Sequence, residues 1–150
     1  GYYNSMDDES GADPLVKNSE LRFLVGYEQD LSELAKDFTI GVQYYLEYML
    51  DYGDYVRTLP AGVPHRDESR HVTTLRLTKQ MMQQNLELSL FAYYSPSDKD
   101  AYLRPAVSYK ISDSWHIGAG ANVFAGETDT TFFGQFDKNT NVYGMLRYSF

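Results

Sequence analysis

Apolar and polar residues alternate along this chain with a period of two. Every second residue from Phe38 to Leu50 is Phe, Ile, Val, Tyr or Leu, and most residues between them are polar or small. A helix would scatter both sets around its surface, whereas a strand places them on opposite faces. The pattern therefore predicts a β-strand from Phe38 to Leu50. This strand is longer than the average strand, which has about 5 to 6 residues.

The same alternation recurs in six other segments, so the sequence predicts seven strands in one all-β, antiparallel, up-and-down unit. The further segments are 20–28, 72–81, 86–94, 102–111, 115–124 and 141–150. We expect a bulge at Pro105, because proline cannot donate a ladder hydrogen bond. Gly1 to Tyr3 is predicted to be the end of a preceding strand, and Lys79 to direct its charged end beyond its strand.

The predicted connections alternate in length. The short ones are 32–35, 82–85 and 112–114, the long ones are 4–19, 51–69 and 126–140, and 95–100 is a short member of the second set. Transmembrane barrels of the outer membrane have short periplasmic turns and longer extracellular loops. This pattern therefore predicts a transmembrane barrel whose last strand runs towards the periplasm.

A soluble barrel with its apolar face turned inward would show the same alternation. The aromatic residues of the apolar face favour a membrane, since they concentrate towards strand ends, as the two interfacial girdles of a transmembrane barrel do. They are Tyr27, Tyr48, Tyr94, Tyr109, Trp115, Tyr148 and Phe150.

The amino-acid composition is consistent with β-strands, and the net charge excludes one class of binding partner. Aromatic residues make up 15% of the chain, cysteine is absent and the net charge is −8. A nucleic-acid partner is excluded, because binding phosphates requires a basic surface. The sequence has no apolar run long enough for a spanning helix, although a barrel needs none.

The last nineteen residues, from Phe132 to Phe150, resemble the C-terminus of porin-like β-barrel proteins of the Gram-negative outer membrane. A terminal Phe with an aromatic residue two positions earlier resembles the signal read by the barrel assembly machinery, and Phe150 and Tyr148 occupy those places. Gly144 lies one position away from the glycine of that pattern. The resemblance implies a location in the cell outer membrane, among its lipids and lipopolysaccharide.

The number of strands bears on what the chain can do. Bacterial barrels of one chain have an even number of strands, and seven would leave one edge unpaired. We therefore expect residues 1–150 to be one unit that forms the C-terminal portion of a larger barrel. A small barrel of eight strands, closed by a short N-terminal strand, is the alternative. A homo-oligomer is a separate expectation about the partners of the chain.

Charged residues on the polar faces of the strands are the candidate functional residues. They would line a channel for ions and small hydrophilic solutes, which they select by charge. These residues are Arg22, Glu47, Arg76, Glu87, Arg104, Lys110 and Arg147. In a narrow barrel the same residues would form buried ion pairs in a closed lumen, which predicts a structural or interaction protein without an open pore.

An enzyme is the least favoured class. His116 on the polar face could act as a base with Glu47 or Glu87, as in a barrel hydrolase, but no serine motif accompanies it. His65 and His71 are predicted to lie in a solvated loop. Acidic residues at 7–9 and at Asp13 do not have the spacing of a calcium loop. The sequence predicts no cofactor, no metal site and no catalytic residue.

Overall fold

The structure of the chain is a computed structural model that describes residues 1–13 and 15–150. These residues form one eight-stranded sheet, one α-helix and one 3-10 helix. The strands are β1 (Tyr2–Tyr3), β2 (Glu20–Asp30), β3 (Phe38–Met49), β4 (Ser69–Met81), β5 (Leu86–Ser95), β6 (Asp100–Lys110), β7 (Trp115–Gly126) and β8 (Asn141–Tyr148). The helices are α1 (Tyr52–Thr58) and η1 (Gly134–Asn139).

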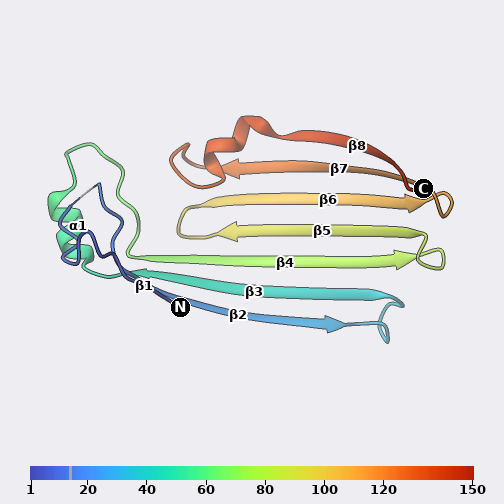
Figure 1. Ribbon diagram of the computed structural model, residues 1–150, viewed down its shortest axis with the longest axis horizontal. Coiled ribbons are helices and arrows are strands. Elements are labelled where there is room, and N and C mark those ends of the chain that lie inside the picture. Colours follow the sequence, from blue (N-terminus) through green and yellow to red (C-terminus); the bar gives the residue numbers. More distant parts are fainter. Residues whose placement is uncertain (14) are drawn as a thin grey trace.

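The strands lie in the sheet in the order of the sequence, and each pairs antiparallel with the next (Figure 1). The prediction of an all-β, up-and-down antiparallel unit is confirmed, including a short first strand, in which Tyr2 pairs with Leu21 and Tyr3 with Glu20. The sheet is open, so the described residues do not form the closed eight-stranded barrel given above as the alternative, and the expectation of a larger barrel stays a prediction. β1 and β8 are its two edges, and β1 is too short to pair with more than the first residues of β2.

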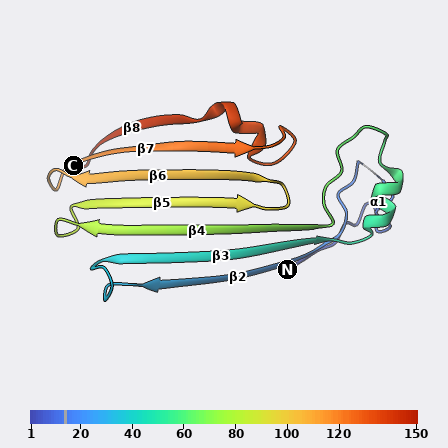
Figure 2. The same ribbon diagram turned by 180° about the vertical axis from the view of Figure 1, so that it is seen from behind.

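The connections divide the sheet into two ends, as the sequence predicts. Short connections 31–37, 82–85 and 111–114 lie at one end, which we call the turn end. Connections 4–19, 50–68, 96–99 and 127–140 lie at the other, the loop end, where α1 is found (Figures 1 and 2). The C-terminus lies at the turn end (Figure 1).

Pro105 does not produce the predicted bulge. The pairing of β6 with β7 skips Arg104 and Pro105, but Leu103 pairs with Val123 and Ala106 with Gly120, so the register is the same on both sides. Pro105 itself lies opposite Leu90 of β5. The missing donor thus interrupts the ladder locally without inserting a residue.

The two faces of the sheet differ in polarity and in exposure, and the apolar side chains are the more exposed ones. On β6, Leu103, Val107 and Tyr109 are exposed, whereas Ala106 and Ser108 on the other face are partly buried. We call the first surface the apolar face and the second the polar face. Among the described residues the only buried hydrophobic side chains are those of Met49 and Val72. Their register places both on the polar face, opposite Glu20 and Tyr45.

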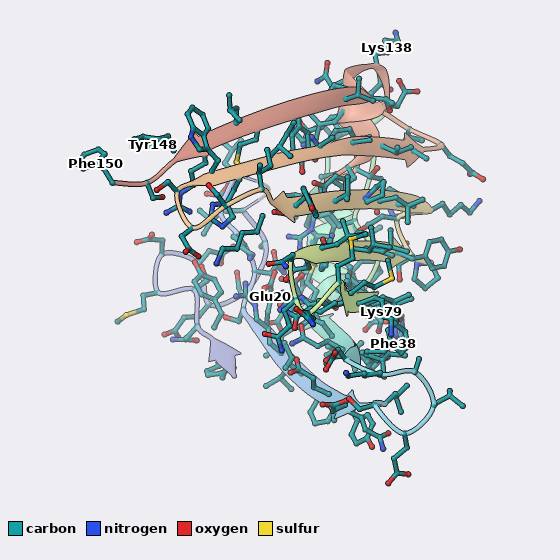
Figure 3. The ribbon with its side chains drawn as sticks, turned by 90° about the vertical axis from the view of Figure 1, so that its right-hand side faces the viewer. Glu20, Phe38, Lys79, Lys138, Tyr148 and Phe150 are labelled. Atoms are coloured by element: carbon teal, nitrogen blue, oxygen red, sulfur yellow. The ribbon has the colours of Figure 1, made fainter. Side chains whose placement is uncertain are left out.

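The sheet curves around its polar face. Figure 3, which looks along the strands from the turn end, shows Glu20 on the inside of the curve and Phe38 and Lys79 on the outside. Phe38 and Lys79 are register partners on the apolar face. The exposed apolar face is therefore convex and the polar face concave.

Helices contribute little to this architecture. α1 has 7 residues and lies in the connection between β3 and β4. Across the described residues, no helix combines the length and apolar character required to cross a bilayer.

Candidate functional site

All seven candidate residues named from the sequence lie on the polar face. Arg22 pairs in register with Glu47, and Lys110 pairs with His116, which in turn pairs with Arg147. Arg76 and Arg104 are both opposite Phe91, and Glu87 is opposite Gln80. The candidates therefore share one surface, but they spread over it from the loop end to the turn end.

At the loop end, charged side chains form a dense ion-pair network. Glu20 is fully buried, and its carboxylate binds Arg22 at 2.7 Å, Lys17 at 3.1 Å and Arg66 at 3.4 Å. Glu47 lies 3.4 Å from Arg22. Buried carboxylates are stable only when cations and hydrogen bonds replace the water that they lose. The network therefore ties the loop residues Lys17 and Arg66 to the ends of β2 and β3.

Arg70 extends this network across β4 and β5. Its guanidinium group binds Asp98 at 2.5 Å, donates to the Tyr93 hydroxyl at 2.7 Å and lies 3.6 Å from Glu47. Asp98 also accepts a hydrogen bond from the buried hydroxyl of Ser95 at 3.0 Å. Arg70 thus links three strands to the connection between β5 and β6.

The connection between β7 and β8 folds over the polar face and inserts Phe133 there. The ring of Phe133 lies 4.9 Å from that of Tyr102, stacked, and 4.6 Å from that of Tyr93, edge-on. The Phe133 backbone N–H donates to the buried carboxylate of Asp100 at 2.8 Å. A Cβ on Gly134 would meet the Thr128 carbonyl oxygen at 2.0 Å, so this tight path requires glycine.

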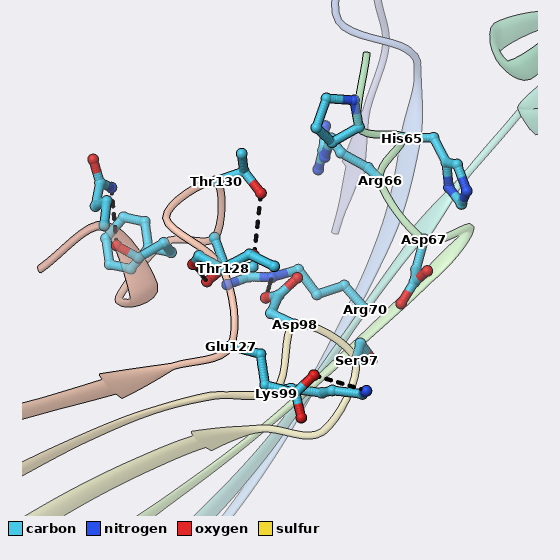
Figure 4. A pocket seen from close by; sticks show the side chains of 14 residues that line it. His65, Arg66, Asp67, Arg70, Ser97, Asp98, Lys99, Glu127, Thr128 and Thr130 are labelled. Carbon is cyan, nitrogen blue, oxygen red and sulfur yellow. Dashed lines mark hydrogen bonds and ion pairs between the residues drawn. The ribbon is translucent and has the colours of Figure 1, made fainter. Parts of the chain in front are cut away.

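These loops enclose a cavity of about 630 Å³ at the mouth of the polar face (Figure 4). Arg66, Arg70 and Lys99 line it together with Asp67, Asp98 and Glu127. Its charges are largely paired, since Lys99 binds Glu127 at 2.9 Å and Arg70 binds Asp98. The hydrogen bond to Glu127 raises the pKa of Lys99 above its ordinary value.

In the middle of the polar face the charges are arranged differently. Arg76 and Arg104 flank Phe91 across β4, β5 and β6, and both are exposed. Among the described residues neither arginine lies within 4.0 Å of a carboxylate. They line a hollow of about 390 Å³ that has no acidic residue in its wall. Two guanidinium groups are therefore free to meet a solute.

The turn end carries smaller features. Lys110 binds Asp113 at 2.7 Å, and this hydrogen bond lowers the pKa of Asp113. Tyr148 of the suggested assembly signal lies 4.8 Å from the Trp115 ring and 6.4 Å from the Phe150 ring, measured between centroids. Three aromatic rings thus gather at this edge of the apolar face.

Among the described residues, His116 forms no hydrogen bond with Glu47 or Glu87, the two carboxylates suggested as its partners. His116 is flanked by Lys110 and Arg147, and its buried Nδ1 has no hydrogen-bond partner among the described residues. Glu47 pairs with Arg70, near the loop end. Within the described part of the chain, no group of three acidic or histidine side chains is placed to hold a metal ion.

Sequence reasoning missed the residues that build the loop end. The prediction that His71 lies in a solvated loop is wrong, because β4 begins at Ser69, and Nδ1 of His71 lies 2.7 Å from the Tyr44 hydroxyl. Arg70 lies an even number of positions from Arg76 along the strand. If the predicted strand at 72–81 is extended by two residues towards the N-terminus, Arg70 falls on the same face as Arg76. No local pattern marks Phe133, whose partners are distant in sequence.

Comparison with known proteins gives no family for this sequence. No protein-family model matches the chain, and no curated protein matches it.

Proposed function

We propose that this chain forms wall strands of a water-filled transmembrane β-barrel in the outer membrane of a Gram-negative bacterium, and that the barrel conducts small hydrophilic solutes passively. One observation carries the proposal, namely that the convex face of the sheet is apolar and exposed while the concave face is polar. A transmembrane barrel requires this arrangement, because lipid surrounds its outside and water fills its lumen.

The direction of curvature is the main argument against a soluble barrel. A soluble barrel of this size buries its apolar side chains inside, where they form a core. Here Phe23, Val25 and Ile117 on the apolar face are about half exposed or more. So large an apolar surface on a water-soluble protein would need a partner to cover it, and a bilayer supplies that cover over the whole face.

Strand length and strand ends add support. The seven long strands have 8 to 13 residues, against about 9 to 11 needed to cross a bilayer at a tilt. Trp115, Tyr148 and Phe150 cluster at the turn end, as interfacial aromatic residues do. Lys79 directs its ammonium group to the Lys36 carbonyl oxygen in the turn region, as expected for a lysine on a lipid-facing surface.

The open edges imply additional strands in the functional assembly. Within the described part of the chain, the outer edges of β2 and β8 have no strand partner over most of their length. Hydrocarbon does not tolerate unpaired backbone groups, since each costs several kcal/mol. In the proposal, further strands of the same polypeptide or of other copies close the barrel between these edges.

Conductance tests this function. The full-length protein, reconstituted in a planar lipid bilayer, is expected to give discrete conductance steps that change in ion preference when Arg76 and Arg104 are replaced. Purified protein that inserts into the bilayer and gives no conductance would contradict the channel.

That second outcome would favour a structural or interaction barrel. The ion-pair network of Glu20 and the Phe133 cluster occupy the loop end of the concave face, which is the arrangement expected of a closed lumen. The total number of strands distinguishes the two, because a barrel of about eight strands has an interior filled by side chains.

The barrel assembly machinery is the proposed partner of the last strand. Phe150 is fully exposed and Tyr148 is 56% exposed, so both rings are accessible at the end of β8. Phe150→Ala is expected to lower the amount of folded protein in the outer membrane, whereas Phe132→Ala, in a loop, should not. Equal amounts for both variants would contradict this role.

A further inference from the structure

The hollow in the middle of the polar face has a composition that suits a particular ligand. Its wall consists of Arg76 and Thr78 from β4, Ser89, Leu90 and Phe91 from β5, and Tyr102 and Arg104 from β6. Its volume of about 390 Å³ lies within the range of roughly 300 to 1,000 Å³ for small-molecule pockets. It is separate from the larger cavity between the loops.

The register fixes the spacing of the two arginines. Arg76 and Arg104 are both direct partners of Phe91, on the strands to either side of it. Neighbouring strands are about 4.8 Å apart, so the two arginines start from backbone positions about 10 Å apart, with the Phe91 ring between them. The two side chains thus rise on either side of Phe91, so a ligand with an anionic group at each end can reach both guanidinium groups while its middle lies over Phe91.

The nearest acidic residues of the same face leave the arginines free. Glu28 lies two strands from Arg76 along the same row, beyond Gly41, and lines a neighbouring hollow that Arg76 also borders. Glu87 accepts a hydrogen bond from Gln80 at 3.4 Å. Neither forms an ion pair with Arg76 or Arg104, which contrasts with the saturated guanidinium group of Arg70.

We propose that this hollow binds small aromatic dicarboxylates, with one carboxylate on Arg76, the other on Arg104, and the ring against Phe91. Arginine binds a carboxylate through two parallel hydrogen bonds, which adds geometric selectivity to the charge attraction. Phe91 lies 6.1 Å from Tyr102, centroid to centroid, so the ligand ring meets an aromatic surface. The hydroxyl groups of Thr78 and Ser89 are available to the remaining carboxylate oxygens.

This inference deepens the proposed function by naming a solute class, and it rests on that function for the access of water to the concave face. The inference differs from a general attraction of anions because it requires two carboxylates at opposite ends of an aromatic ring. Terephthalate carries that feature, benzoate has the ring with one carboxylate, and sulfate has the charge without the ring. These three anions are therefore matched probes.

Isothermal titration of the full-length protein in detergent tests the site. Terephthalate is expected to bind about tenfold or more tightly than benzoate, and sulfate is expected to compete weakly. Arg76→Gln and Arg104→Gln should each lower terephthalate affinity to the level of benzoate. Lys138→Gln removes the same charge from η1, away from the hollow, and should leave the affinity unchanged.

Arg76→Lys and Arg104→Lys provide a second test that preserves the charge. Lysine lacks the planar fork, so these variants should retain affinity for benzoate while losing most of the preference for terephthalate. Equal affinity of the wild type for terephthalate and benzoate would overturn the proposal, as would equal losses in Arg76→Gln and Lys138→Gln.

Conductance separates this inference from the function on which it rests. Conductance without selective terephthalate binding would refute the ligand site and leave the channel standing. Selective binding without conductance would refute the channel and leave the ligand site standing. In a conducting protein, terephthalate should reduce the current at concentrations that leave Arg104→Gln unaffected.

Discussion

The loop end and the middle of the polar face both carry arginines, but they use them differently. At the loop end Arg22, Arg66 and Arg70 face the carboxylates of Glu20, Glu47 and Asp98 at distances of 2.5 to 3.6 Å. In the middle, Arg76 and Arg104 flank a phenylalanine and no carboxylate lines their hollow. The same residue type on the same face therefore forms ion pairs in one place and is exposed, with no ion pair among the described residues, in the other.

The difference follows from burial. Glu20 is fully buried, so each of its cations replaces lost hydration and helps to fix a loop. Arg76 and Arg104 are exposed and keep their hydration, so their positions have little to do with stability. Substitutions in the first region should change folding, and those in the second should change solute selection.

The largest effect on stability is expected for Glu20→Gln. A neutral amide cannot form ion pairs with Arg22, Lys17 and Arg66, so their positive charges would lose their partner. The free energy of unfolding in detergent should therefore fall by about 2 to 3 kcal/mol. Glu28→Gln on the same strand and face is the control, expected to change it by less than about 0.5 kcal/mol. Equal losses of stability in Glu20→Gln and Glu28→Gln would contradict the stabilising role assigned to the ion pairs of the loop end.

Phe133→Ala should have a smaller effect, about 2 kcal/mol, because the ring is partly exposed although it packs on Tyr93 and Tyr102. The variant should also conduct more, since the loop no longer covers the concave face. The control is Phe132→Ala, whose ring is 60% exposed. An unchanged unfolding curve for Phe133→Ala would mean that this loop does not depend on the aromatic cluster.

Arg76→Glu is expected to alter stability by less than about 0.5 kcal/mol while shifting the ion preference of the channel towards cations. Reversal potentials in a salt gradient measure the preference, and chemical unfolding measures the stability. A large loss of stability with unchanged preference would place Arg76 with the structural charges of the loop end.

The smallest effect concerns Asp8, in the connection between β1 and β2. Hydrogen bonds from Ser10 and the Asp13 backbone lower the pKa of this carboxyl. A lowered folded-state pKa means that the contribution to stability is present above the ordinary pKa of aspartate and is lost as the pH falls through the folded value. Unfolding measured from pH 6 to about pH 3 should show a slightly steeper loss for wild type than for Asp8→Asn.

Alternation predicts the strands well because it is set by neighbouring residues. The β7 side chains Trp115, Ile117 and Val123 could be assigned to one face from their parity, and the structure places them there. The role of Glu20 could not be predicted, because it depends on Lys17 and Arg66 from two different connections. The sequence predicts that these strands belong to a larger barrel and leave an edge unpaired, and the sheet is open with β1 and β8 at its edges. The partners of those edges could not be predicted, because edge pairing depends on residues that no local pattern describes.

The central claim is that the apolar face of the sheet meets lipid and the polar face meets water. The most direct test measures whether each face is in contact with lipid or with water in a bilayer. The chain has no cysteine, so single cysteines can carry nitroxide spin labels without background. Leu103 and Val107 report on the apolar face, and Ala106 and Ser108 on the polar face of the same strand. In liposomes, labels at 103 and 107 should collide mainly with oxygen and labels at 106 and 108 mainly with a water-soluble nickel complex. Equal access of the nickel complex to all four positions would contradict a lipid-facing apolar surface.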